Sequence, residues 1–236
     1  MGGIEKVCVI GLDAATFSLI NPWVEEGKLV HFKRLMEEGC FGNLPSTIPP
    51  QTPPAWTSSV TGQNPGKHNV YDFFKFDGDD YRRKLTNHGD RRTKAVWNLL
   101  SEEGKRVGIV NVPFTYPPEK VNGFMVSGSP IPSTARDHTY PDSLIREIVD
   151  QIPGYRLWGD LDRRDEETLL KEIYRTTETE IALVSYLMER KPWDFFMAVF
   201  VGLDIVQHLF WRHMDRSHPH HSAKTSNHLA EGITGG

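Results

Sequence analysis

This sequence contains few cysteines, no long apolar run and only a small net charge. Its 236 residues include only two cysteines, Cys8 and Cys40, which are too few for a disulfide framework. The apolar neighbours of Cys8 favour a buried, reduced thiol. The longest apolar run, residues 195–203, has the length of a strand and falls well short of the roughly 20 residues that span a bilayer. The N-terminus lacks the basic region of a signal peptide. We therefore expect a cytoplasmic protein with no membrane partner.

The charge balance also excludes classes of partner. Lysine and arginine number 27, aspartate and glutamate number 31, and the net charge of −4 is spread along the chain. Because nucleic acids and anionic membranes select strongly basic surfaces, we expect neither as the main partner. The oligomeric state cannot be read from these features.

Apolar strands and helical segments alternate along the chain. Continuous apolar runs predict strands that are buried on both faces, and they end at or before residues 12, 112, 127 and 204. Helical signals cover residues 31–38, 94–103, 142–151 and 166–190, and Asn21-Pro22 is typical of a further helix start. This alternation predicts an α/β fold with a mostly parallel central sheet flanked by helices, in one domain over residues 1–236. Residues 71–92 and 129–165 do not fit that pattern and are interpreted as lid or cap insertions.

Proline is concentrated around one threonine. The stretch "TIPPQTPPAWTSSVTG" (47–62) places four prolines around Thr52. Proline lacks a backbone N–H and has a fixed φ, so the stretch predicts a rigid loop instead of a helix or central strand. Thr52 is then either a nucleophile held by that loop or a residue that makes local turn hydrogen bonds.

Three further polar residues follow predicted strands. Asp13 follows the first strand, and Asp204 follows the last one, with His208 four residues later. On a helix, positions i and i+4 share a face, so this carboxylate and imidazole can bind one divalent ion. The alternatives are a turn or capping role for each aspartate and simple packing for the histidine. Sites in open α/β sheets form at the carboxyl ends of strands, which would bring these residues and Thr52 to one face.

The segments "VIGLDAATFSLI", "TIPPQTPPAWTSSVTGQNPGKHNVYDF" and "GLDIVQHLFW" together resemble the alkaline phosphatase superfamily, in particular its type I phosphodiesterase and nucleotide pyrophosphatase branch. They occur in the family's order and extend over essentially the whole chain. The resemblance implies a hydrolase of phosphodiester or pyrophosphate bonds that acts on a small phosphate ester or nucleotide. It implies Thr52 as the nucleophile, which forms a phosphothreonine intermediate that water hydrolyses.

The same resemblance implies two divalent metal ions, zinc being usual in the family. Asp13 and Thr52 would contact one ion, and Asp204 and His208 would hold the other. His68 is interpreted as structural support. Two positions depart from the family pattern: Ala55 replaces a common asparagine, so the Thr52 N–H is a candidate donor to phosphate, and Asn69 replaces a glycine, which asparagine can mimic in a left-handed turn.

The family's later metal ligands, an Asp-His pair and a further histidine, have no counterpart here. The chain therefore resembles the N-terminal part of such an enzyme, as if C-terminally truncated, and each ion would have about two protein ligands instead of the usual three or four. We expect little or no turnover from this chain alone. Residues 216–236, with several histidines, are expected to form a polar tail. The alternatives are a phosphomonoesterase, phosphomutase or phosphonate hydrolase of the same superfamily, or a non-catalytic scaffold that has lost its metals.

Overall fold

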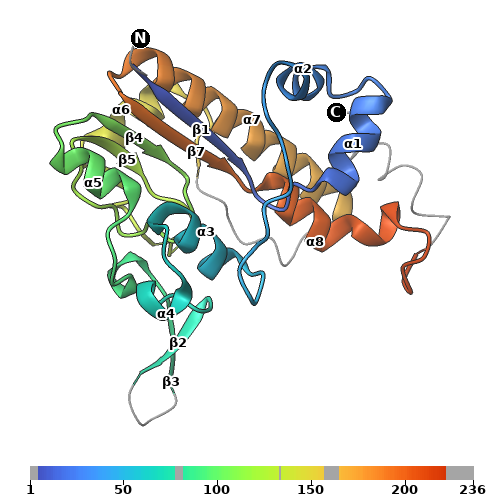
Figure 1. Cartoon of the computed structure of the whole chain (residues 1–236), viewed down its shortest axis with the longest axis horizontal. Helices are drawn as coiled ribbons and strands as arrows, with labels where there is room; N and C mark the ends of the chain where they lie inside the picture. The colour runs from blue at the N-terminus through green and yellow to red at the C-terminus, as the bar shows by residue number, and fades with distance from the viewer. Residues whose placement is uncertain (1–4, 78–81, 133, 157–164, 222–236) are drawn as a thin grey trace. The chain divides into compact units, whose positions relative to one another are not determined.

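A computed structural model describes residues 5–77, 82–132, 134–156 and 165–221 (Figure 1). The chain divides into two compact units, and each is described by itself. The first unit comprises Met1–Gly11 and Thr47–Gly202, and the second comprises Leu12–Ser46 and Leu203–Gly236.

The first unit is built on a five-stranded sheet. Its strand order is β1 (Val7–Leu12), β7 (Phe195–Phe200), β4 (Val107–Val110), β5 (Gly123–Val126) and β6 (Thr139–Tyr140). Strand β4 runs parallel to both β5 and β7, whereas the short β6 is antiparallel to β5. The predicted mostly parallel sheet is therefore confirmed. Helices lie on both of its faces.

Alternating side chains of the strands form a core on each face of the sheet. One core joins the sheet to α6 (Leu144–Gln151) and α7 (Glu166–Arg190), and the other joins it to α3 (Thr52–Thr61) and α5 (Val96–Glu102). In a strand, successive side chains point to opposite faces, so an uninterrupted apolar sequence is needed to fill both cores. Strand residues of the first core are Val110, Phe124, Val126, Phe196 and Ala198, and those of the second are Val107, Ile109, Met125, Phe195, Met197 and Val199.

Strand β1 has the predicted limits but not the predicted burial. It lies at one end of the described strand order, and Val7 and Ile10 are 43% and 50% exposed. Cys8 is exposed as well, so the expectation of a buried thiol is wrong. The apolar sequence indicated a central strand, but a strand at the edge of a sheet has only one neighbour to cover it.

The predicted helices differ from the observed ones mainly at their starts. Helix α7 has its predicted limits, and α2 (Val30–Glu38) ends before Gly39 as expected. Helix α1 (Phe17–Glu25) begins earlier than the Asn21-Pro22 signal, because the Thr16 side chain accepts a hydrogen bond from the Ser18 N–H and caps it. The second unit contains α1 and α2 together with most of α8 (Gly202–Met214).

The two segments interpreted as insertions contain their own short elements. Residues 71–92 include the antiparallel strand pair β2 (Phe74–Asp77) and β3 (Arg82–Leu85), followed by a 3₁₀ turn, η2 (His88–Asp90). Residues 129–165 include β6 and α6. Their role as a lid stays a prediction.

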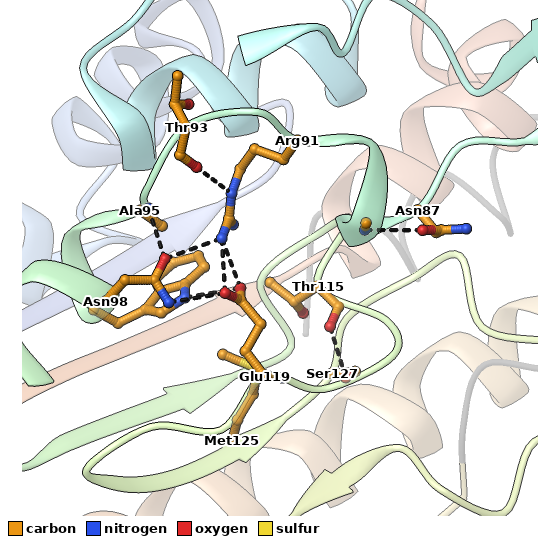
Figure 2. Close-up of polar contacts among 11 residues, drawn as sticks. Asn87, Arg91, Thr93, Ala95, Asn98, Thr115, Glu119, Met125 and Ser127 are labelled. Atoms are coloured by element: carbon orange, nitrogen blue, oxygen red, sulfur yellow. Dashed lines mark hydrogen bonds and ion pairs between the residues drawn. The ribbon is translucent and has the colours of Figure 1, made fainter.

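A buried polar cluster ties the loop after β4 to the start of α5 (Figure 2). Arg91 Nη2 lies 2.8 Å from both carboxylate oxygens of Glu119, whose oxygens also accept hydrogen bonds from the Trp97 indole and the Asn98 amide. Burial by itself would raise the pKa of Glu119, but the Arg91 charge and these hydrogen bonds hold that pKa below its ordinary value. The cluster therefore contains a charged, fully bonded carboxylate.

Within the described ranges, no helix combines the length and apolar character required to cross a bilayer. The predicted polar tail is described only as far as His221, and its remainder lies outside the described residues.

Candidate active site

Thr52 is the first residue of α3, so the expectation that it lies in a non-helical loop is wrong. Pro53 and Pro54 follow it in the first helical turn and are both buried. A residue in the first turn has no intrahelical acceptor for its N–H, so proline costs little there, and its fixed φ suits a helix. The prolines near Thr52 therefore mark the start of a helix instead of excluding one.

The first turn of α3 leaves one backbone amide available beside the Thr52 side chain. Pro53 and Pro54 have no N–H, and the Ala55 N–H donates to the Gln51 carbonyl at 3.0 Å. Within the described residues, this leaves the Thr52 N–H as the donor at the helix start. The N-terminus of a helix carries a partial positive charge, so this position favours an anionic group such as a phosphate.

Packing against the sheet fixes the position of α3. Trp56 packs against the second core, and Val60 is part of it. A Cβ atom built on Gly11 of β1 would lie 2.5 Å from Trp56 Cη2. Only glycine therefore leaves room for the indole there. Trp56, which follows the atypical Ala55, has a packing role in α3.

His68 and Ser58 form a hydrogen bond that resembles a nucleophile–base pair. Ser58 Oγ lies 2.9 Å from His68 Nε2, and the Val70 N–H donates to His68 Nδ1 at 3.1 Å. Because Nδ1 accepts a hydrogen bond, the neutral ring carries its proton on Nε2 and donates it to Ser58. Burial first, and then the charge of Arg91, lower the pKa of His68 and favour this neutral form. His68 thus cannot accept the Ser58 proton, and its expected supporting role fits the geometry.

The turn at Asn69 has the left-handed conformation although asparagine replaces the glycine of the family pattern. Asn69 ends the short helix α4 (Pro65–His68) with a φ of 67°. This is the left-handed conformation that glycine adopts most easily and asparagine tolerates. The Asn69 side chain also donates to the Asp90 carbonyl at 3.2 Å, which holds the turn in place.

Asp204 and His208 lie on one face of α8 in the second unit. Asp204 Oδ1 is 3.4 Å from His208 Nε2, with side-chain exposures of 27% and 76% respectively. Together with Ala14, Gln207 and Trp211 they line an open pocket of about 300 Å³. The Gln207 amide donates to the Ala14 carbonyl at 2.9 Å and so connects α8 to the turn after β1.

The spacing of this pair fits a zinc ion. Two tetrahedral zinc ligands about 2.1 Å from the metal lie about 3.4 Å from each other, which is the separation of Asp204 Oδ1 and His208 Nε2. However, the described residues contain no group of three histidine, cysteine, aspartate or glutamate side chains that could share an ion. The pair therefore fits half of a zinc coordination shell.

Asp13 lies in the turn after β1, where its Oδ1 accepts a hydrogen bond from the Ala14 N–H at 3.1 Å. Ala14 has a φ of 60° and lines the pocket, whereas Asp13 does not. This is a hydrogen bond within the turn, whereas the residue that caps α1 is Thr16. Of the four predicted site residues, Asp204 and His208 are brought together; Asp13 precedes the pocket residue Ala14 in the same unit, and Thr52 belongs to the first unit.

Two lining residues of this pocket were not singled out from the sequence. Gln207 and Trp211 stand three and seven residues after Asp204, so the helical period places them on its face. That spacing was the signal available in "GLDIVQHLFW". A search of that pattern for metal ligands passes over both residues, because amide and indole side chains are not typical zinc ligands.

The first unit has a small polar cavity where β4, β5 and β7 end. Asn111 follows β4 and donates to Glu180 of α7 at 3.1 Å, and Ser127 and Val201 line the same cavity. Its volume of about 30 Å³ has room for one or two waters. We therefore do not treat it as a substrate site.

The chain matches a protein-family model and a set of solved structures. A family model described as type I phosphodiesterase / nucleotide pyrophosphatase matches residues 7–231. No curated protein sequence matches the chain significantly.

Among solved structures, phosphonoacetate hydrolase from Sinorhizobium meliloti 1021, determined with phosphonoacetate and with phosphonoformate, superposes with a TM-score of 0.61 at 17% identity. The match covers 98% of this chain and 52% of that enzyme, so the chain spans about half the length of its structural relative. Murine ectonucleotide pyrophosphatase / phosphodiesterase 5 gives a TM-score of 0.46 at 15% identity, over 86% of this chain and 45% of that protein.

Proposed function

Because the chain belongs to the type I phosphodiesterase / nucleotide pyrophosphatase family, we propose that it acts in a metal-dependent hydrolase of phosphodiester or pyrophosphate bonds, with Thr52 as the nucleophile. The substrate is a small phosphate ester or nucleotide. The observation that carries this proposal is the position of Thr52 at the start of α3, where one hydroxyl, one N–H and the positive end of a helix occur at the same residue.

The chemistry proceeds in two displacements at phosphorus. Thr52 Oγ attacks the phosphorus, the bond to the leaving alcohol or phosphate breaks, and the hydroxyl proton passes to solvent. A water molecule then attacks the phosphothreonine, which releases the phosphate product and restores the Thr52 hydroxyl. In both steps the Thr52 N–H donates to a phosphoryl oxygen and so stabilises the charge that develops there.

We propose that the enzyme uses two divalent ions, with zinc as the metal. Asp204 and His208 would hold one ion, and the family resemblance assigns Asp13 and Thr52 as ligands of the other. When bound, zinc lowers the pKa of a hydroxyl and neutralises phosphoryl charge, which a threonine needs because its own hydroxyl is a weak nucleophile. Since Asp204 and His208 supply two donors, we expect weak zinc binding and slow turnover by the 236-residue chain.

The likeness to phosphonoacetate hydrolase shows the fold and does not select between phosphate esters and phosphonates. A phosphonate hydrolase, phosphomonoesterase or phosphomutase therefore remains the alternative within the superfamily, and a metal-free scaffold is the alternative outside it. A substrate panel distinguishes them: bis(4-nitrophenyl) phosphate, 4-nitrophenyl phosphate and phosphonoacetate, each with added zinc.

The direct test of the nucleophile compares Thr52→Ala with Ser59→Ala. Ser59 offers a matched control, because its hydroxyl lies on the same helix and is exposed. We expect mass spectrometry of acid-quenched wild-type protein to find a phosphoryl group on the Thr52 peptide, and hydrolysis of the diester to fall to background only in Thr52→Ala. Wild-type turnover by the Thr52→Ala protein would show that the mechanism is wrong.

The test of the metal pair is zinc titration calorimetry of the wild type, His208→Ala and His31→Ala. His31 is an exposed histidine on α2 and controls for adventitious binding. We expect His208→Ala to lose the zinc isotherm and His31→Ala to retain it. Equal zinc binding by all three proteins would remove His208 from the site, and an ordered wild type that binds no zinc would favour the scaffold.

A further inference from the structure

An open pocket lies where the parallel strands of the first unit begin. Arg106 immediately precedes β4, Gly123 is the first residue of β5, and Lys191 lies shortly before β7; all three line the pocket. Its volume of about 360 Å³ is within the range of small-molecule sites. The small polar cavity at Asn111 lies where the same strands end, so the pocket and the cavity are at opposite edges of the sheet.

Part of the pocket wall is apolar. Phe124 and Leu144 line it and are only 4% and 3% exposed, because both belong to the core between the sheet and helices α6 and α7. Pro141 and Pro192 add further apolar surface. A hydrocarbon or aromatic portion of a ligand would be removed from water here, which favours binding.

The acidic side chain in the pocket wall, Glu147, is already paired. Its Oε1 accepts a hydrogen bond from the Tyr186 hydroxyl at 2.9 Å, and its Oε2 accepts one from Lys191 Nζ at 2.6 Å. The hydrogen bond from Lys191 first, and then that from Tyr186, hold the pKa of Glu147 below its ordinary value against the effect of burial. This carboxylate therefore does not require a cationic ligand.

The two cationic side chains in the wall have donors to spare. Arg106 Nε and Nη2 donate to Asp194 at 3.1 and 2.8 Å, whereas Arg106 Nη1 has no acceptor among the described residues. Lys191 Nζ donates to Glu147 and carries two further N–H groups. Asp194 does not line the pocket, so the wall itself contains two cations and one acid. This balance favours an anionic group.

We propose that this pocket binds an anionic amphiphile, in which a carboxylate or phosphate group contacts Arg106 and Lys191 and a hydrocarbon or aromatic body packs against Phe124 and Leu144. Hydrogen bonds from cationic donors to such an anion are about twice as strong as those between neutral groups. The site is accessory to catalysis, because reacting ligands of open α/β sheets bind at the carboxyl ends of the strands and this pocket is at their amino ends. It requires no metal and does not depend on the proposed hydrolase activity.

The test is an amide NMR titration of the wild-type chain with hexanoate, hexyl phosphate, hexanol, hexylammonium and acetate at neutral pH. We expect the amide signals of Gly123 and Ser143, which both line the pocket, to shift with the two hexyl anions, whose relative affinities distinguish carboxylate from phosphate. Hexanol lacks the charge and acetate lacks the chain, so each should bind about 10-fold more weakly than hexanoate, or worse. Hexylammonium should not bind.

Two variants locate the binding, each with a matched control. Ser143→Trp adds bulk at an exposed lining residue whose side chain does not cap α6, and Asp150→Trp places the same ring on α6 outside the pocket. Arg106→Gln removes a charged donor, and Arg146→Gln removes an exposed arginine that does not line the pocket. We expect Ser143→Trp and Arg106→Gln each to weaken hexanoate binding by about 10-fold or more, with both controls within about twofold of wild type.

Three results would overturn the proposal: equal affinity of the wild type for hexanoate and hexanol, shifts that do not include Gly123 and Ser143, or unchanged hexanoate binding by Ser143→Trp. Loss of the Arg106–Asp194 ion pair can destabilise Arg106→Gln, but Ser143 is exposed, so its substitution tests the site without that complication. None of these measurements involves hydrolysis, so an inactive chain that binds hexanoate would support the pocket and count only against the proposed function.

Discussion

Substitution of Glu119 in the buried Arg91–Glu119 ion pair should strongly reduce the stability of the protein. The two side chains are 7% and 13% exposed, and the carboxylate accepts hydrogen bonds from Arg91, Trp97 and Asn98. Glu119→Gln removes the negative charge and leaves a buried guanidinium without its counter-ion. Breaking a buried ion pair in this way costs about 3–5 kcal/mol, which corresponds to a fall in Tm of about 6–20 °C for a chain of this size.

The assay is urea and thermal denaturation of wild type, Glu119→Gln and a surface control. Glu102→Gln serves as that control because Glu102 pairs with Lys94 at 2.6 Å while both side chains are more than half exposed. An exposed pair contributes about 0–1 kcal/mol. If Glu119→Gln destabilises the protein no more than Glu102→Gln does, the argument from burial is refuted.

The pH dependence gives an independent check on Glu119. Its folded-state pKa lies below the ordinary value of 4.5, so the stabilisation is fully present above pH 4.5 and is lost as the pH falls through the folded-state pKa. The difference in unfolding free energy between wild type and Glu119→Gln should therefore shrink on acidification. Arg91→Met combined with Glu119→Gln should recover part of the loss, since no unpaired charge then remains buried.

Two further predictions concern the helix that carries Thr52. Gly11→Ala places a Cβ 2.5 Å from the Trp56 ring, so we expect a loss of about 1–3 kcal/mol in urea denaturation, partly relieved by Trp56→Phe. Ser58→Ala leaves the buried His68 N–H without its acceptor and should cost about 1–3 kcal/mol while diester turnover is unchanged. A folded Ser58→Ala protein without activity would instead identify Ser58 as catalytic and would contradict a proton on His68 Nε2.

The sheet could be predicted because each buried strand is a short continuous apolar segment and several such segments recur along the chain. Strands β4, β5 and β7 are apolar at nearly every position, and the long α7 has a capping Asp165 at its start and a helical apolar spacing. A strand that is buried on both faces needs apolar residues at every position, whereas a helix that is buried on one face needs them only at helical spacing. The prolines near Thr52 predict a loop, whereas the structure has a helix there, because proline is excluded from a helix interior but is favoured in the first turn.

The candidate site was predictable only in part. Asp204 and His208 meet because four residues complete about one turn of helix, a relation that the sequence displays. Arg91 and Glu119 are 28 residues apart in the sequence. No local sequence pattern relates them, so their ion pair could be identified only from the folded structure. The exposure of β1 could not be predicted either, since an apolar strand has the same sequence pattern at the edge of a sheet as at its centre.

That exposed strand has a consequence for the behaviour of the chain in solution. The six residues of β1, "VCVIGL", include no charge and no proline, the two features by which natural proteins discourage unwanted pairing of sheet edges. A short, uncharged, β-prone segment of this kind is a template for self-association into stacked strands. At high concentration the chain should therefore tend to aggregate through β1.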